Sequence, residues 1–213
     1  MSSTVIGIPT EIKTDERRVS LTPMAVGEIT SNGSQVVVQS GAGEGAGFDN
    51  NQYEKAGAKI VETAEDVFKE SKIIVKVKEP QEDERNLLTP EHTLFTYLHL
   101  AADKKQTEDL ISSNSTCIAF ETVTDDQGSL PLLTPMSAIA GRMSIQAGAH
   151  CLEARQGGAG VLLAGAPGAE PGRVVVIGCG VVGSNAVEIA VGMGAEVIVL
   201  DRDQKTLDSI DEK

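Results

Sequence analysis

The most constraining feature of the sequence is a glycine-rich turn, GCGVVG, which starts at Gly178 between an apolar strand and a helical pattern. Gly178 permits a tight turn, Gly180 lets the backbone approach a pyrophosphate, and Gly183 lets the helix pack closely on the strand. The amides of Val181 and Val182 would face the phosphates from the helix N-terminus, where the helix dipole favours an anion. This context predicts the phosphate-binding turn of a dinucleotide-binding domain.

A second apolar strand, Val197–Leu200, follows the helical segment and leads into Asp201. A carboxylate there accepts hydrogen bonds from ribose hydroxyls and repels a 2′-phosphate, which favours NAD(H) over NADP(H). The alternative is a glycine-rich turn of some other α/β protein, but strand, helix, second strand and terminal acid together argue against it. A complete domain of this type has about six strands. The sequence offers two, so we expect an incomplete domain that keeps the adenosine side of the cofactor.

Upstream, short β-rich runs alternate with helical segments, a pattern typical of a parallel sheet with helices on its faces. The expected fold class is α/β with two Rossmann-like domains. We assign residues 1–133 to a flavodoxin-like or Rossmann-like substrate and catalytic domain. Residues 134–213 are expected to form an interdomain helix and the first βαβ unit of the NAD-binding domain. The expected strands are Val5–Ile8, Val36–Gln39, Ile73–Val77, Leu94–Leu98, Cys117–Phe120 and Val174–Ile177.

Local signals predict three helices in more detail. Thr22, followed by a proline, is typical of an N-cap, and the helix it opens should end at Asn32 before a glycine. A second helix should start at Thr107, whose hydroxyl can cap the run through Ser113. A third, rich in alanine and glycine, should extend from Ser137 to Gln156 and let other backbones approach closely.

Charge and cysteine content narrow the function classes. The net charge of −13 would repel a phosphate backbone or an anionic bilayer, so neither nucleic acid nor membrane is an expected partner. No apolar run is long enough for a membrane helix and the start lacks a signal-peptide pattern, which predicts a cytoplasmic protein. Three widely spaced cysteines without a CxxC pair argue against disulfides and zinc. We expect no metal, and three reduced, partly buried thiols, Cys117, Cys151 and Cys179.

Several basic residues are candidates for a small-molecule site in this acidic chain. His99 follows an expected strand, and its imidazole suits proton transfer, although a structural histidine is the plainer alternative. Lys76 and Lys78 alternate with valines, which is typical of a solvated strand face. Arg17 and Arg18 follow the first strand, where a guanidinium could bind a small carboxylate, or could lie in a solvated loop.

Seven segments carry a recognisable pattern, in this order: GIPTEIKTDERRVSLTP, GAGEGAGF, KVKEP, LFTYLHLAA, ETV, LPLLTPMSAIAGRM and VVVIGCGVVGSNA. They resemble alanine dehydrogenase, from Val5 to about Asp201. The resemblance implies an NAD-dependent oxidoreductase that reversibly deaminates L-alanine to pyruvate and ammonium, as a homohexamer. The same superfamily includes the NAD(H)-binding alpha subunit of proton-translocating transhydrogenase, which matches KVKEP, FTYLHLAA and PMSAIAGRM less closely.

The resemblance implies roles for five residues. The substrate arginine of the family falls on Arg18, its substrate-carboxylate lysine on Lys78 and its catalytic histidine on His99. Its serine beside the cofactor falls on Ser137, and its NAD-selecting acid falls on Asp201. Lys76 receives no role and keeps the interpretation of a solvated strand face.

The sequence departs from the family at two positions and in length. Phe120 stands where the family has a tyrosine or a similar residue before Glu-Thr-Val, and Thr206 stands at a position where the family has a basic residue, with Lys205 beside it. Family members continue well past residue 213, so the chain is expected to be truncated. Two alternatives therefore stay open: a transhydrogenase-type subunit and a non-catalytic nucleotide-binding fragment.

Overall fold

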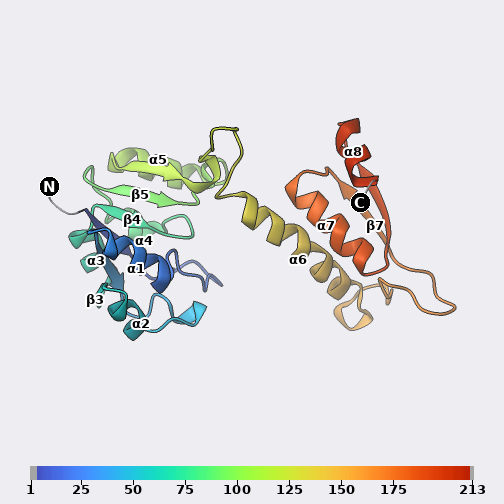
Figure 1. Cartoon of the computed structure of the whole chain (residues 1–213), viewed down its shortest axis with the longest axis horizontal. Coiled ribbons are helices and arrows are strands. Elements are labelled where there is room, and N and C mark those ends of the chain that lie inside the picture. Colours follow the sequence, from blue (N-terminus) through green and yellow to red (C-terminus); the bar gives the residue numbers. More distant parts are fainter. Residues whose placement is uncertain (1–3, 212–213) are drawn as a thin grey trace. The chain divides into compact units, whose positions relative to one another are not determined.

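A computed structural model describes residues 4–211, which divide into two compact units between Thr124 and Asp125 (Figure 1). Each unit has its own sheet and its own hydrophobic core. The expected boundary between residues 133 and 134 falls inside the second unit, in the first helix or just before it. The assignment of a substrate domain to residues 1–133 stays a prediction.

The first unit is built on a six-stranded parallel sheet with the order β3-β2-β1-β4-β5-β6. This is the order of a doubly wound α/β fold, in which strand order reverses between β1 and β4. The α/β class is thus confirmed. The strands are β1 Val5–Ile8, β2 Gln35–Gln39, β3 Lys59–Val61, β4 Ile73–Val75, β5 Thr93–Thr96 and β6 Thr116–Ala119.

Helices cover both faces of this sheet because its strands alternate buried side chains between two cores (Figure 1). In β2, Val36 and Val38 join one core with Val26 and Tyr53, whereas Val37 joins the other core with Phe68 and Leu110. The helices and short 3-10 segments are α1 Pro23–Ser31, η1 Glu44–Ala46, α2 Asn50–Lys55, α3 Ala64–Glu70, α4 Glu82–Arg85, η2 Leu100–Ala102, α5 Lys104–Ser113 and η3 Phe120–Thr122.

The local helix signals were right for α1 and wrong for α5. The Thr22 side chain accepts from the amide of Ala25, and Asn32 ends α1 as expected. Helix α5 instead starts at Lys104, because Asp103 caps it by accepting from the amide of Gln106. Thr107 lies inside the helix, where its hydroxyl donates to backbone carbonyls.

Several expected strands end early because the chain leaves the ladder at the carboxyl edge of the sheet. The strand expected through Val77 ends at Val75, and the one expected through Leu98 ends at Thr96. The strand expected through Phe120 gives way to η3 at that residue. The segments that directly follow β4 and β5 are irregular, and they carry Lys76, Lys78 and His99.

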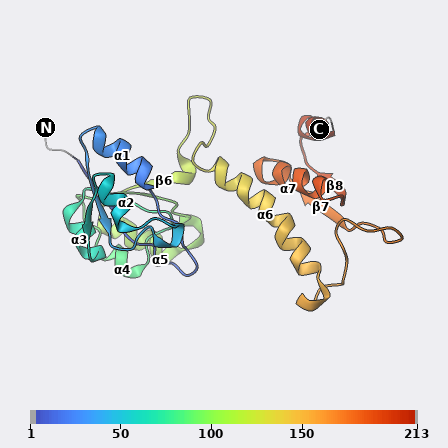
Figure 2. The ribbon, with the colours of Figure 1, turned by 60° about the horizontal axis from the view of Figure 1, so that its bottom comes forward.

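The second unit combines a long helix with one βαβ unit, seen from a second direction in Figure 2. Parallel strands β7 and β8 are joined through α7, as the glycine-rich turn predicted. Helix α6 starts three residues before the expected Ser137 and ends at Leu152, followed by a 3-10 turn. The elements are α6 Thr134–Leu152, η4 Ala154–Gln156, β7 Arg173–Ile177, α7 Val181–Gly192, β8 Glu196–Leu200 and α8 Gln204–Asp211.

Helices α6 and α7 touch at the level of the backbone. A Cβ added at Gly141 of α6 would lie 2.2 Å from the carbonyl oxygen of Val182, in the first turn of α7. Gly141 therefore permits a close approach that a larger side chain would prevent. The alanine- and glycine-rich composition of α6 predicted such an approach.

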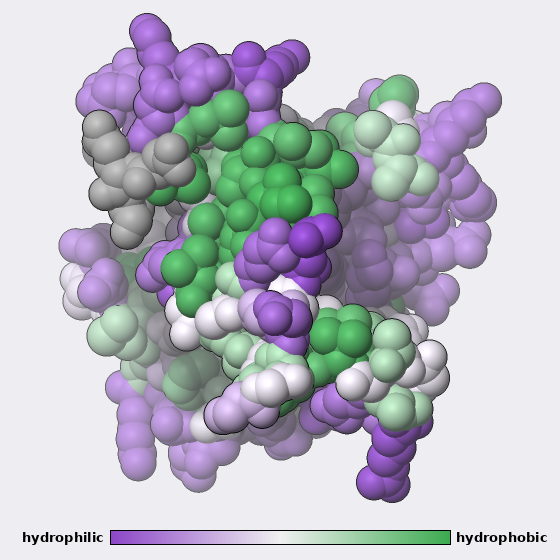
Figure 3. All heavy atoms as spheres, turned by 90° about the vertical axis from the view of Figure 1, so that its right-hand side faces the viewer, coloured by the Kyte–Doolittle hydropathy of each residue, from purple (hydrophilic) through white to green (hydrophobic). Residues whose placement is uncertain are grey.

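One face of the β7–β8 ribbon is apolar and open to solvent. Val176 is buried against α7, whereas four side chains on the opposite face are exposed. Figure 3 looks onto the second unit and shows apolar side chains gathered on one face of it. The four exposed side chains are Val175, Ile177, Ile198 and Leu200.

Membrane helices and cysteine pairing can be checked for the described residues. No helix between residues 4 and 211 is long and apolar enough to cross a membrane. The three thiols differ more than expected: Cys179 is buried and Cys117 half-buried, whereas Cys151 is exposed.

Candidate functional site

Three of the five residues singled out by the resemblance lie at one edge of the first sheet. Arg18 follows β1, Lys78 follows β4 and His99 follows β5, so all three lie beyond the carboxyl ends of adjacent strands. The reversal of strand order between β1 and β4 makes this edge the switch point of the fold, where α/β proteins bind their ligands.

Arg18 is oriented by a nearby carboxylate. Its Nε donates to Glu16 Oε1 at 2.8 Å and its Nη2 donates to Oε2 at 2.5 Å, while its backbone amide also donates to Oε1. These bonds hold the pKa of Glu16 at about 2 and raise that of Arg18 above its usual value. Lys78 adds to the positive potential at Glu16, so the two cationic residues lie near one carboxylate.

Lys78 has a fixed backbone and a free ammonium. Its amide donates to Glu11 Oε2 at 3.3 Å, and its carbonyl accepts from the hydroxyl of Thr96 at 2.9 Å. Its half-buried side chain forms no hydrogen bond or ion pair with any residue that the structure describes. A cation without a partner, close to an arginine, is suited to bind an anionic group.

Lys76 contradicts the interpretation of a solvated strand face. Its side chain is 1% exposed, and its ammonium lies 3.1 Å from Glu11 Oε2 and 2.6 Å from Glu84 Oε1. Because β4 ends at Val75, the simple alternation of a strand no longer applies at Lys76 and Lys78. Burial raises the pKa of Glu84, against the opposing charge of Lys76.

His99 occupies a strained backbone conformation that a carboxylate stabilises. Its φ is +49°, in the left-handed region. Glu121 accepts from the amides of Leu98 at 3.1 Å and His99 at 2.6 Å. Burial alone would raise the pKa of Glu121, but the amide hydrogen bonds outweigh burial and lower it. The exposed imidazole is thereby held beyond the carboxyl ends of β1, β4 and β5.

An aromatic cluster forms the wall of this edge. Tyr97 stacks on His99 with ring centroids 6.0 Å apart, and its ring also meets Phe120 edge-on at 5.1 Å. Burial raises the pKa of Tyr97, while the charge of Arg18 opposes that shift, which places the phenol near the guanidinium. The ring of Phe120, the residue that departs from the family, therefore packs against the ring of Tyr97.

In the second unit, the glycine-rich turn has the geometry that its sequence predicts. Gly178 has φ +87°, which favours glycine, and a Cβ added at Gly183 would lie 2.0 Å from the carbonyl oxygen of Gly178. Gly180 is the N-cap of α7, so Val181 and Val182 lie in the first turn. The first amides of a helix have no acceptor within it and can bind an anion.

Asp201 lies beside this turn, at the end of β8. Its Oδ2 accepts from the amide of Cys179 at 2.6 Å and its Oδ1 accepts from the amide of Asp203 at 2.9 Å. The amides of Asp203 and Cys179 lower the pKa of Asp201, so it is an anion at neutral pH. A hollow of about 470 Å³ opens next to it, lined by Gly178, Leu200 and Arg202 among others.

Ser137 lies on the face of α6 that approaches the turn. It stands one helical turn before Gly141, and residues four apart share a face. Since Gly141 meets Val182 at the backbone, Ser137 lies on the side of α6 that faces the first turn of α7. The family has a basic residue at the position of Thr206. Here the Thr206 hydroxyl donates to Asp203 and the neighbouring Lys205 is exposed, so neither side chain takes the place of that basic residue.

The residues of the second unit fit the adenosine half of a nicotinamide dinucleotide. The turn has no Cβ at Gly180, where nothing lies within 4 Å, and the α7 amides and the Asp201 carboxylate offer the donors and acceptors that a phosphate and a ribose need. No group of three His, Cys, Asp or Glu within residues 4–211 is arranged to hold a metal ion.

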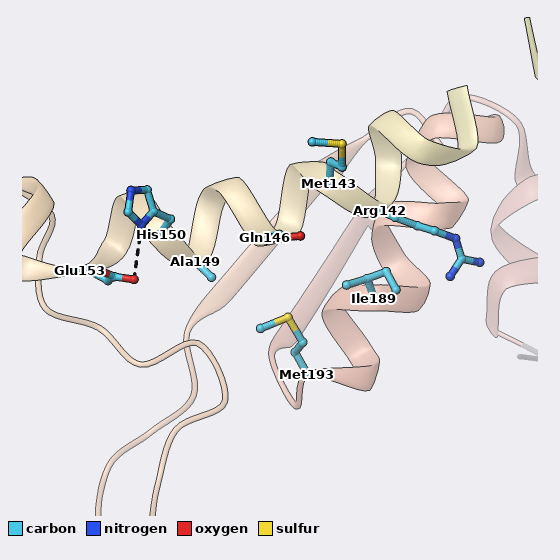
Figure 4. A pocket seen from close by; sticks show the side chains of 8 residues that line it. All are labelled: Arg142, Met143, Gln146, Ala149, His150, Glu153, Ile189 and Met193. Carbon is cyan, nitrogen blue, oxygen red and sulfur yellow. Dashed lines mark ion pairs between the residues drawn. The ribbon is translucent and has the colours of Figure 1, made fainter. Parts of the chain in front are cut away.

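A second hollow of the same unit, about 580 Å³, lies between α6 and α7 and contains none of the predicted site residues (Figure 4). In Figure 4, Arg142 points away from the ion pair of His150 with Glu153. Arg142 instead pairs with Glu188 of α7 at 2.7 Å. The pair of Arg142 with Glu188 links α6 to α7, and the pair of His150 with Glu153 lies at the end of α6. The polar groups that line the hollow therefore do not point towards one common ligand position.

Sequence reasoning missed the carboxylates that hold the basic residues. Glu11, Glu16 and Glu121 each accept a backbone amide at or next to Lys78, Arg18 or His99. Glu16 is two residues from its partner and could have been found from that spacing. Glu11 and Glu121 are distant in sequence from the residues they bind, so no local pattern indicated them.

Two family models cover nearly the whole chain. "Alanine dehydrogenase/PNT, N-terminal domain" matches residues 7–140, and "Alanine dehydrogenase/PNT, C-terminal domain" matches residues 144–213. The alanine dehydrogenase of Halomonas elongata is 52% identical over 208 residues, which are 98% of this chain and 56% of that protein. The chain thus spans just over half the length of the curated relatives it matches.

Solved structures share the fold. A solved L-alanine dehydrogenase superposes with a TM-score of 0.90 at 48% identity, over 98% of this chain and 58% of that one. The transhydrogenase from Sinorhizobium meliloti superposes with a TM-score of 0.81 at 23% identity, over 98% of this chain and 62% of that one. The second likeness concerns the fold alone.

Proposed function

The chain belongs to the alanine dehydrogenase/PNT family, and we propose that it supplies the substrate site and the adenosine-binding half of the cofactor site of an NAD-dependent alanine dehydrogenase. In this reaction L-alanine, NAD⁺ and water give pyruvate, ammonium, NADH and a proton, and the reverse aminates pyruvate. The proposal concerns a protein of the length of the relatives, of which this chain spans just over half.

One observation carries the proposal: two cationic side chains and a histidine converge at the switch point of the first sheet. A small carboxylate substrate needs a cationic clamp, and its reacting carbon needs a proton-transfer group beside it. Arg18 and Lys78 supply the clamp and His99 supplies the imidazole. The free ammonium of Lys78 supports this assignment, because an unpartnered cation at a ligand edge is otherwise unexplained.

The clamp binds the substrate carboxylate through the side chains of Arg18 and Lys78. Glu16 orients the guanidinium of Arg18, which binds the substrate carboxylate, by accepting from its Nε and Nη2. Lys78 approaches the same carboxylate as a point charge. Two cations on one carboxylate fix the orientation of Cα, and positioning of this kind supplies much of the rate in a two-substrate reaction.

His99 moves protons at the substrate nitrogen and oxygen. Its imidazole takes a proton from the water that adds to the imino acid, and it returns a proton as ammonia leaves the carbinolamine. Tyr97 and Glu121 hold the ring and its backbone in place for these transfers. When bound, the nicotinamide accepts or supplies the hydride.

The cofactor site favours NAD. Gly178, Gly180 and Gly183 shape the turn, the first amides of α7 would bind the pyrophosphate, and Asp201 would accept from the ribose hydroxyls. A 2′-phosphate would meet the charge of Asp201, so NADP binds more weakly. Ser137, on α6, would contact the bound cofactor. The family's homohexameric state stays a prediction for this chain.

The test compares this chain with a chimera that continues after residue 213 with the matching remainder of the Halomonas elongata relative. NADH formation is followed at alkaline pH with L-alanine and NAD. We expect activity in the chimera, much less in the chain alone, and a large loss on His99→Asn, since that histidine comes from this chain.

Other outcomes would favour the alternatives. Hydride exchange between nucleotides without any amino acid would point to the transhydrogenase-type reading. A folded chimera that binds NAD but turns over neither substrate would point to a non-catalytic nucleotide-binding protein. Activity that survives His99→Asn would contradict the proposed role of His99.

A further inference from the structure

The backbone that carries Lys78 leaves the sheet at a defined point. The amide of Lys76 still donates to β5, at the carbonyl of Phe95. The next two amides turn to Glu11 instead: Val77 donates to Oε1 at 2.6 Å and Lys78 donates to Oε2 at 3.3 Å. One carboxylate therefore replaces the neighbouring strand as the acceptor for this segment.

Glu11 is itself held in place from within the core. Its side chain is 3% exposed, and Oε2 also faces the ammonium of Lys76 at 3.1 Å. Lys76 is paired in turn with Glu84, which is equally buried. A buried carboxylate with three charge-assisted contacts has little freedom to move, because each contact is stronger in a medium of low dielectric constant.

The result is a lysine that is rigid at its backbone and unbound at its tip. The carbonyl of Lys78 accepts from Thr96 while its amide donates to Glu11, so both sides of the residue are fixed. Its ammonium contacts no acceptor within residues 4–211. A flexible side chain of this length reaches one place only when its Cα is anchored.

We propose that Glu11 is the positioning residue for Lys78: its carboxylate fixes the backbone of Val77 and Lys78 so that the ammonium reaches the substrate carboxylate bound by Arg18. This inference rests on the proposed carboxylate-binding role of Lys78. It assigns a substrate-binding function to a buried acid that touches no substrate.

The competing explanation is that Glu11 only stabilises the fold. A substitution of Glu84 distinguishes this explanation from the positioning role. Both acids are buried and both pair with Lys76, but Glu84 contacts neither the amide of Val77 nor that of Lys78. Glu84→Gln therefore removes the same charge from the same buried cluster and leaves the proposed positioning contacts in place.

The first experiment observes Lys78 directly, in the full 213-residue chain without ligand. The backbone amide and the Cε–Hε signals of Lys78 are compared by NMR in the wild type, Glu11→Gln, Glu11→Asp and Glu84→Gln. We expect both Glu11 variants to move these signals towards random-coil positions and Glu84→Gln to leave them near their wild-type positions. The aspartate variant keeps the charge opposite Lys76, so it folds even where the glutamine variant does not.

The second experiment measures the affinity for pyruvate in the same proteins. We expect Glu11→Gln and Glu11→Asp to raise Kd about tenfold and Glu84→Gln to change it by less than about threefold. Unchanged Lys78 signals in the Glu11 variants overturn the inference whether or not pyruvate binds. Equal effects of the Glu11 and Glu84 variants overturn it as well, because both would then reflect stability alone.

A Lys78→Met variant tests the proposed role of Lys78 separately from the inference about Glu11. If pyruvate binds equally well to Lys78→Met, the carboxylate-binding role of Lys78 is wrong. If Lys78→Met weakens binding and both Glu11 variants do not, the role of Lys78 stands and the positioning role of Glu11 is overturned.

Discussion

The carboxylate of Glu121 accepts the backbone amide of His99 at 2.6 Å and thereby stabilises a histidine whose φ is +49°. A residue with a Cβ rarely adopts this conformation unless its surroundings compensate for the strain. The compensation here comes from η3, which follows the neighbouring strand β6. The proposed proton-transfer group is therefore positioned by an element other than its own.

Glu121→Ala should release His99 from this conformation. Loss of the acceptor for two amides is expected to destabilise the fold by about 1–3 kcal/mol. The chemical shifts of the His99 backbone, measured by NMR, should move away from left-handed values, and urea unfolding gives the stability. Glu54→Ala, at an exposed position of α2, is the matched control and should leave both unchanged.

Glu16 should make the stability of the chain depend on pH in the acid range. Its pKa lies at about 2, below the usual 4.5, because Arg18 donates to it. A depressed pKa stabilises the fold above the unfolded value, and that contribution disappears as the pH falls through the folded value. The stability difference between wild type and Glu16→Gln should thus be full above pH 4.5 and vanish towards pH 2.

Urea unfolding between these pH values measures the difference for Glu16. Arg18→Met removes the donor and should flatten the same acid limb, and the double variant should add nothing further. Parallel curves for wild type and Glu16→Gln would rule out the linkage.

Gly183→Ala should disturb the turn that we propose to bind the pyrophosphate. The added Cβ would lie 2.0 Å from the carbonyl oxygen of Gly178, so strand and helix must separate. Overpacking of this kind typically destabilises a fold by about 1–3 kcal/mol, and NAD binding followed by calorimetry should weaken as well. Gly192→Ala is the control, because nothing lies within 4 Å of its added Cβ. Equal behaviour of the two variants would contradict the prediction.

Lys76→Met should destabilise the first unit strongly. It leaves the carboxylates of Glu11 and Glu84 buried without their counter-charge, and breaking a buried pair costs about 3–5 kcal/mol. The control is Lys59→Met, whose surface pair with Glu70 contributes about 0–1 kcal/mol. Denaturant unfolding measures the free energy of unfolding of both variants. A similar decrease in both would mean that the buried ion pairs of Lys76 stabilise the fold no more than a surface pair does.

The apolar face of β7 and β8 should determine how strongly the second unit binds a hydrophobic dye and self-associates. Ile177 is 83% exposed and Leu200 is 52% exposed. Replacing both with threonine should reduce binding of a hydrophobic dye and self-association seen by light scattering, with little change in thermal stability. Val176→Thr, on the buried face, should instead lower the melting temperature. Unchanged dye binding in the double variant would show that the dye binds elsewhere.

The sequence predicted what short-range chemistry determines. The cap at Thr22, the φ of Gly178 and the close packing at Gly183 each follow from residues only a few positions apart. Where two nearby residues could serve as a cap, the prediction failed, because Asp103 rather than Thr107 starts α5. Strand β3 was missed, since Lys59–Val61 is too short to show a period.

Long-range contacts account for what the sequence could not predict in the candidate site. Lys76 was interpreted as solvated because its neighbours alternate, whereas its burial depends on Glu11, which precedes it by 65 positions. The amide of His99 meets Glu121 only because β5 and β6 are adjacent. The resemblance identified the basic residues, and the structure adds the acids that hold them.

The backbone contact between Gly141 and Val182 has a mechanical consequence. Because no side chain separates the two backbones, a shift of α6 towards α7 would press directly on the first turn of α7. A displacement of α6 would therefore act on the first amides of α7, which we propose to bind the pyrophosphate, and Ser137 lies on the same helix α6.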